Sequence, residues 1–137
     1  MNRTNIVRSI LTVACAVLLI VAGSCRRASH NGAIDGNWKN LTIETLATGE
    51  VEDLSGVNRF IAINLELMQL RGVSLLTGEI DYHKREHLLT VDFPNTDVKA
   101  LSVYGIDENP VTFTVEKANS NRLQLRTSTK LITCRRF

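Results

Sequence analysis

Apolar and polar residues alternate with a period of two along much of the chain after Trp38. Residues 89–93, 111–115 and 123–125 each carry an apolar side chain at every second position. Because successive side chains of a β-strand point to opposite faces, this pattern predicts strands that are buried on one face. Between the alternating segments we expect turns, where polar residues cluster at 83–86, 94–97, 107–109, 119–121 and 128–130.

Residues 58–70 fit two periods. Their apolar positions alternate as in a strand, but Phe60, Ile63 and Leu67 would also share one face of a helix. We favour a strand because the neighbouring segments are strands. About eight strands are then expected, at 36–46, 58–70, 73–82, 87–93, 98–104, 110–117, 121–127 and 130–136. Short connections predict an all-β, antiparallel up-and-down barrel, with a two-sheet β-sandwich as the alternative.

The first 24 residues follow a different pattern. Arg3 and Arg8 are their only charged residues, and 10–22 is an almost wholly apolar run of thirteen residues. A helix of that length rises about 20 Å, whereas the apolar core of a bilayer is about 30 Å thick. A basic start, a short apolar run and then small residues are typical of a secretory signal peptide. A transmembrane anchor and ordinary cleavage near Ser24 are the alternatives.

The tetrapeptide Ala22-Gly23-Ser24-Cys25 resembles the lipobox of bacterial lipoproteins, although the usual leucine is alanine here. In that family a diacylglyceride is attached to the cysteine, and the signal is cut just before it. The resemblance implies a signal peptide at 1–24, a lipid-bearing Cys25 with a polar tether at 25–35, and one domain at 36–137. The membrane would then be a partner through the lipid. We expect the protein in the bacterial cell envelope, on the outer membrane facing the periplasm.

Removal of the signal changes the charge balance. The remaining chain has fourteen basic and fourteen acidic residues, so its formal net charge is zero. No basic stripe interleaved with aromatic residues is visible in the sequence, which gives a nucleic-acid partner no support. Cys25 and Cys134 are the cysteines left. If Cys25 is acylated, Cys134 is either a small core residue or a thiol nucleophile.

The two ends of the domain carry a second resemblance. Gly36-Asn37-Trp38 opens the first expected strand, and the last strand ends in two arginines. This pairing resembles the calycins and, more narrowly, the lipocalin-like domains of bacterial lipoproteins. The resemblance implies that Trp38 closes one barrel end, with Arg135 or Arg136 packed across it. An arginine can stack on an indole while donating hydrogen bonds to loop carbonyls.

The resemblance also implies non-catalytic binding of a small apolar molecule or lipid, in or at the mouth of the barrel. The side chains expected to face such a ligand are mostly aliphatic, namely Leu89, Val91, Phe93, Leu101, Val103, Val111, Phe113, Val115, Leu123 and Leu125. Short strands make a shallow barrel, so a packed core is the alternative. The protein would then bind a protein or glycan through its loops.

One stretch carries a metal motif. The residues from His83 to His87 read H-x-x-E-H, which in zinc proteases requires a helix so that both histidines share a face. Here the motif lies between two expected strands, so a protease is not predicted. A weak divalent-ion site formed by Glu79, Asp81 and the histidines is the remaining metal hypothesis. We find no G-x-S-x-G nucleophile motif and no glycine-rich phosphate loop, and predict neither catalysis nor a cofactor.

Overall fold

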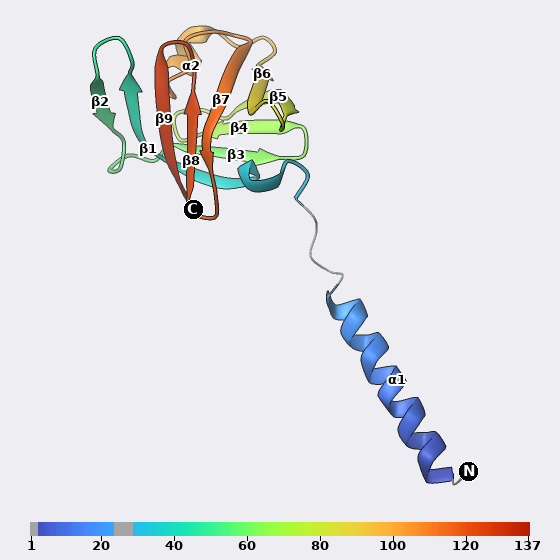
Figure 1. Ribbon diagram of the computed structural model, residues 1–137. Coiled ribbons are helices and arrows are strands. Elements are labelled where there is room, and N and C mark those ends of the chain that lie inside the picture. The colour runs from blue at the N-terminus through green and yellow to red at the C-terminus, as the bar shows by residue number, and fades with distance from the viewer. Residues whose placement is uncertain (1–2, 24–28) are drawn as a thin grey trace.

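A computed structural model describes residues 3–23 and 29–137 (Figure 1). The helix α1 spans Arg3–Gly23 and contains the apolar run of the expected signal. Among the residues described, no helix is long and apolar enough to cross a membrane. Cys25, where lipid attachment is expected, lies outside the described residues.

Residues 29–137 contain nine strands of one antiparallel sheet, eight of which follow one another as a meander. A short 3-10 helix, η1 (Gly32–Ile34), precedes the first strand, and the helix α2 (Val98–Ser102) lies between β6 and β7. The strands are β1 (Gly36–Thr45), β2 (Glu50–Asp53), β3 (Phe60–Asn64), β4 (Leu67–Arg71), β5 (Leu76–His83), β6 (Leu88–Asp92), β7 (Val111–Ala118), β8 (Arg122–Arg126) and β9 (Lys130–Arg136).

The sheet closes on itself. The strands are ordered β2-β1-β3-β4-β5-β6-β7-β8-β9, and β1 also pairs with β9 from Trp38 to Thr45. On its other side, β1 pairs first with β3 and then, beyond Leu41, with β2. Eight strands therefore form a closed barrel, and β2 is an additional strand on the projecting end of β1 (Figure 1). Closure confirms the predicted barrel and excludes the two-sheet sandwich.

The segment expected as a single strand at 58–70 is a hairpin. β3 and β4 pair antiparallel, with Asn64 opposite Leu67, and Leu65 in the turn has a φ of 54°. The segment is thus extended as predicted, rather than helical, but the sequence missed the turn that divides it. The strand β2 was also missed, because all four of its residues are exposed and none alternates with a buried position.

The strand predicted at 98–104 is wrong. This segment begins with the helix α2, whose first turn is capped by Asp97: its side chain accepts a hydrogen bond from the backbone N–H of Lys99. Leu101 and Tyr104 are three residues apart and both fully buried. That spacing suits one face of a helical turn, so helical burial overrode the apparent alternation. The barrel still has eight strands, because the divided hairpin supplies the one that α2 removes.

The barrel interior is packed with apolar side chains. The fully buried residues from facing strands include Ile61, Met68, Leu89, Phe113 and Ile132. Large side chains from α2 and the loop after it, including Tyr104, join the same core. Such close packing leaves the interior sensitive to the addition of even one methyl group.

Residues just before β1 also pack against the barrel. Ile34 is fully buried, and its carbonyl accepts a hydrogen bond of 2.8 Å from the indole Nε1 of Trp38. Asn31 donates from its backbone and side chain to the carboxylate of Asp35. The buried core runs from Ile34 to Cys134 and takes nothing from the described part of α1. Residues 29–137 thus contain the whole barrel and its core, and form a folding unit.

Replacing Gly78 by alanine tests the packing of the interior. A Cβ at this position of β5 would lie 2.6 Å from Val91 Cγ1 and 2.8 Å from Phe93 Cε1. We expect Gly78→Ala to lower the free energy of unfolding by about 1–3 kcal/mol, measured by urea denaturation. Gly56→Ala is the matched control, because nothing lies within 4 Å of its added Cβ. Equal midpoints for the two variants would show that the interior beside Gly78 has room.

Candidate functional site

Trp38 and Arg136 stack on each other at the barrel end where β1 begins, and we call this pair the plug. Trp38 is fully buried, and the guanidinium carbon of Arg136 lies 4.1 Å from the centroid of its ring. The guanidinium donates hydrogen bonds to three backbone carbonyls, of Asp35 at 2.7 Å, Ser120 at 3.1 Å and Asn119 at 3.5 Å. Arg136 thereby joins the segment before β1 to the turn between β7 and β8.

Gly36 is required beside this plug. Its φ is 138°, a conformation that side-chain-bearing residues rarely adopt, and a Cβ there would overlap the guanidinium of Arg136. Arg135 points the other way: it is exposed, and its Nη1 donates to the carbonyl of Arg136. Of the two arginines expected at the barrel end, the structure places Arg136 over Trp38 and Arg135 on the outer face.

The side chains expected to face a ligand are found in the packed core. Eight of them lie on β6, β7, β8 or just beyond β6 and are buried; these are Leu89, Val91, Phe93, Val111, Phe113, Val115, Leu123 and Leu125. Leu101 is buried on α2, and Val103 is the half-buried residue that follows this helix. These last two are not strand residues as predicted. The ten residues belong to the core or pack against it, and none of them lines the two hollows described below.

Asn40 and Cys134 form a polar pair within this core. Both are fully buried, and the Cys134 thiol donates a weak hydrogen bond to Asn40 Oδ1 across 3.7 Å. Among the described residues, Asn40 Nδ2 has no partner. Burial raises the pKa of Cys134 to about 12. The group is therefore a thiol at neutral pH, and a thiol is a poor nucleophile.

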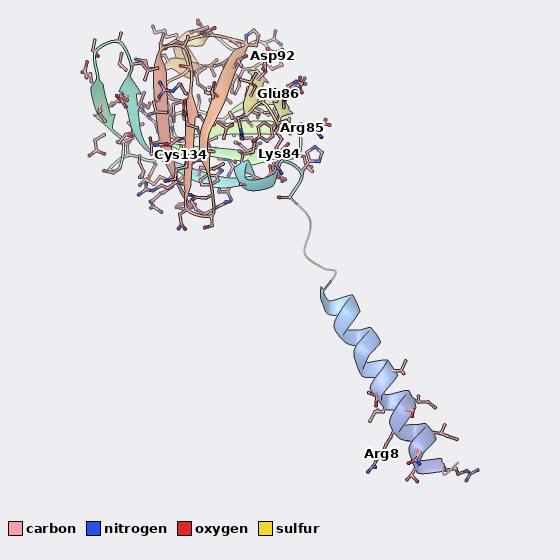
Figure 2. The ribbon with its side chains drawn as sticks, in the orientation of Figure 1. Arg8, Lys84, Arg85, Glu86, Asp92 and Cys134 are labelled. Atoms are coloured by element: carbon pink, nitrogen blue, oxygen red, sulfur yellow. The ribbon has the colours of Figure 1, made fainter. Side chains whose placement is uncertain are left out.

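The histidine motif lies at an exposed turn between β5 and β6, where Figure 2 shows Lys84, Arg85 and Glu86. His83 Nε2 is 3.1 Å from Asp81 Oδ2, and both side chains are exposed. His87 has a φ of 55°, so the motif is not helical. In the part of the chain that the structure describes, no three histidine, cysteine or acidic side chains are grouped to hold a metal ion.

Two hollows lie on the outside of the barrel, over β1, β3 and β4. The first, of about 280 Å³, is lined by Asn37, Phe60, Ala62, Arg71 and Phe137. The second, of about 840 Å³, shares Asn37, Ala62 and Arg71 with the first and continues past Leu67 and Asp35 to Ser29 and His30. We call the two together the outer trough. Its residues were not among the predicted site residues, because they come from four separate segments.

A closed eight-stranded meander whose end is plugged by a first-strand tryptophan and a last-strand arginine defines a small calycin-type barrel. The chain belongs to the family of lipocalin-like domains, whose model matches residues 17–137. Such domains are in general binding folds rather than enzymes. The predicted resemblance to lipocalin-like domains is thereby confirmed.

Two solved structures share the fold. A lipocalin-like protein from Bacteroides uniformis has a TM-score of 0.65 at 16% identity, covering 77% of this chain and 100% of its own. An uncharacterized protein from Bacteroides eggerthii has a TM-score of 0.60 at 13% identity, covering 75% of this chain and 98% of its own. No curated protein matches the chain. At these identities the likeness concerns the fold alone.

Removing the guanidinium of Arg136 should open the plugged end. Arg136→Ala loses the stacking on Trp38 and three hydrogen bonds to carbonyls, so we expect a loss of about 2 kcal/mol in the free energy of unfolding. Arg135→Ala is the control, since its side chain is exposed, and should change stability by less than about 0.5 kcal/mol. A larger effect for Arg135→Ala in urea denaturation would contradict the assignment of the plug.

The thiol of Cys134 should react only when the barrel opens. In residues 29–137 it is the sole cysteine, so Ellman's reagent reports on it alone. We expect no labelling at pH 8 over minutes and full labelling in denaturing urea. Because burial raises the pKa from 9.0 to about 12, folding stability should fall as the pH rises through this window. Rapid labelling of the native protein would show that the core is open at this position.

Proposed function

We propose that the protein is a lipid-anchored, non-catalytic binding protein of the bacterial cell envelope. The observation that carries this proposal is Ala22-Gly23-Ser24-Cys25, placed between an apolar run and a domain of a binding family. The spacing agrees with it, because packed residues begin at Asn31, soon after Cys25. A lipid on Cys25 would therefore hold the barrel close to the membrane.

The tether suits a position at the membrane surface. Arg26 and Arg27 follow Cys25 directly, and basic residues near an anionic membrane surface contribute about 1 kcal/mol each to binding. Residues 26–29 contain no acid. We propose that the domain faces the periplasm from the outer membrane.

The absence of catalysis is supported by the chemistry of the described side chains. The Cys134 thiol is buried and protonated, and the exposed His83 pairs only with Asp81. The ligand of such a binding protein would be a small apolar molecule or lipid. Because side chains pack the barrel interior, we propose that this ligand binds on the outside or at the rim.

A second candidate is a protein or glycan partner that contacts the loops. Val73 and Leu75, between β4 and β5, are 62% and 66% exposed. The hydroxyl of Tyr104 accepts from the N–H of Val73 and donates to the carbonyl of Ser74, which holds the loop in place. A fixed loop that presents two large apolar side chains favours a protein contact.

Intact mass measurement of the full chain, expressed in a diderm bacterium and extracted from membranes, tests the anchor. We expect a mass above that of residues 25–137 by two or three acyl chains, and recovery in the outer-membrane fraction. Cys25→Ala should abolish the added mass. Cys134→Ala is the matched control, and should leave acylation intact. An unmodified mass for the parent chain would refute the anchor.

A further inference from the structure

One row of residues across the outer face of the barrel contains cations and no acid. It runs over β8, β9, β1, β3 and β4 through directly opposed residues, namely Arg122, Arg135, Lys39, Phe60 and Arg71. The three arginines are exposed, whereas Lys39 and Phe60 are half-buried. Like charges directly opposite each other on one face of a sheet are destabilising. This cationic row is therefore a cost to the fold unless an anion offsets it.

Among the described residues, no acid forms an ion pair with a member of the row, and the carboxylate of Asp35, which lines the larger hollow, accepts hydrogen bonds from Asn31 instead. The ion pairs found in the described residues are Arg59–Glu52, His83–Asp81 and Arg126–Glu116, none of which includes a member of the row. Arg71 and Lys39 donate instead to neutral acceptors. Arg71 Nη2 is 2.6 Å from Gln69 Oε1, and Lys39 Nζ is 2.9 Å from the carbonyl of Ser55. Residues 29–137 contain twelve basic and fourteen acidic residues, so this cationic row is a local segregation of charge in a domain with a small acidic excess.

The smaller hollow of the outer trough lies at the Arg71 end of this row. Phe60 and Phe137 form one wall, with their ring centroids 4.9 Å apart and their planes at 63°. Arg71 lines the same hollow, and the small side chain of Ala62 leaves space between them. Phe137 is 71% exposed, so its ring is accessible to a ligand in the hollow. An apolar recess is thereby combined with a guanidinium that forms no ion pair with any acid of the described residues.

The trough has room for a chain beyond this recess. The larger hollow continues from Ala62 along the outer side of the β3–β4 hairpin to Leu67, which is 43% exposed, and Leu65, which is 59% exposed. Apolar surface buried against such residues contributes about 0.8 kcal/mol for each methylene group of a ligand. The Ala62 and Leu67 side of the trough thus suits an apolar chain, and its Arg71 end suits an anionic group.

We propose that the outer trough binds an anionic amphiphile, with its acyl chain over Ala62 and Leu67 and its carboxylate or phosphate head group paired with Arg71. The planar guanidinium can donate two parallel hydrogen bonds to either head group. This assignment rests on the proposed binding function and deepens it, because it names the ligand class and places the site outside the barrel. A free fatty acid and a phospholipid share this chemistry.

The binding test uses residues 29–137, which contain the whole barrel and its core, and three probes. Decanoate has an acyl chain with an anionic head group, and decanol has a similar chain without charge. Vesicles of phosphatidylglycerol, which is anionic, and phosphatidylcholine test whether the ligand is a phospholipid in a bilayer. Calorimetry should show that decanoate binds about tenfold more tightly than decanol in low salt. The difference should shrink in high salt, because a surface ion pair is screened.

Two variants place the ligand in the trough. Arg71→Gln should reduce the affinity for decanoate to that for decanol, and Ala62→Leu should weaken both by filling the recess. Arg122→Gln is the matched control: it removes one positive charge from the same row outside the trough, and should change decanoate affinity less than twofold. Thermal unfolding of each variant checks that the barrel is intact.

The outcomes separate the site from the function. Decanoate binding that depends on Arg71 supports a free acid as the ligand, whereas Arg71-dependent binding to anionic vesicles alone supports a phospholipid. Decanoate binding unaffected by Arg71→Gln and Ala62→Leu would overturn the trough while leaving a binding function in place. Failure of every probe to bind would overturn both the trough and the proposed binding of an apolar ligand, and would favour the protein partner.

Discussion

The pairing of β1 with β9 is the contact on which the rest of the barrel depends. Without it, the meander would be an open sheet with unpaired strand edges on both sides of the seam. The plug belongs to the same contact, because Trp38 and Arg136 are directly opposed residues of this pairing. Stacking of the guanidinium on the indole therefore stabilises the barrel end and the seam together, and Gly36 provides the space it needs.

Strands were predicted correctly where the apolar residues kept to odd or to even positions throughout. The prediction failed where the inward positions changed from odd to even. In β3 the inward residues are the odd-numbered Ile61 and Ile63, and in β4 they are the even-numbered Met68 and Leu70. The exposed leucines at 65 and 67 continue the odd phase and so conceal the turn. At α2 the failure had another cause. The segment is a helix because Leu101 packs into the core from a helical turn, which the alternation of apolar residues does not indicate.

The site was predictable in part. Cys134 and Arg136 are two residues apart in β9, so their side chains lie on the same face of the strand. If Cys134 is buried, Arg136 lies on the inner face at the barrel end and Arg135 on the outer face. That argument needed only the knowledge that Cys134 is buried. The cationic row could not be seen in the sequence, because strand pairing brings together residues as distant as Lys39 and Arg135. Its absence from the linear pattern explains why no basic stripe was predicted.

A barrel of eight strands has an interior that is either filled by its own side chains or occupied by one small ligand. Here the interior is packed. A methyl group added at Gly78 would fit only if the ring of Phe93 moved. The same packing that stabilises a domain without disulfides leaves its outer surface as the place for recognition. The opposed cations on that surface are unfavourable in the isolated domain, and an anionic, partly apolar ligand bound beside the exposed Phe137 would offset this cost.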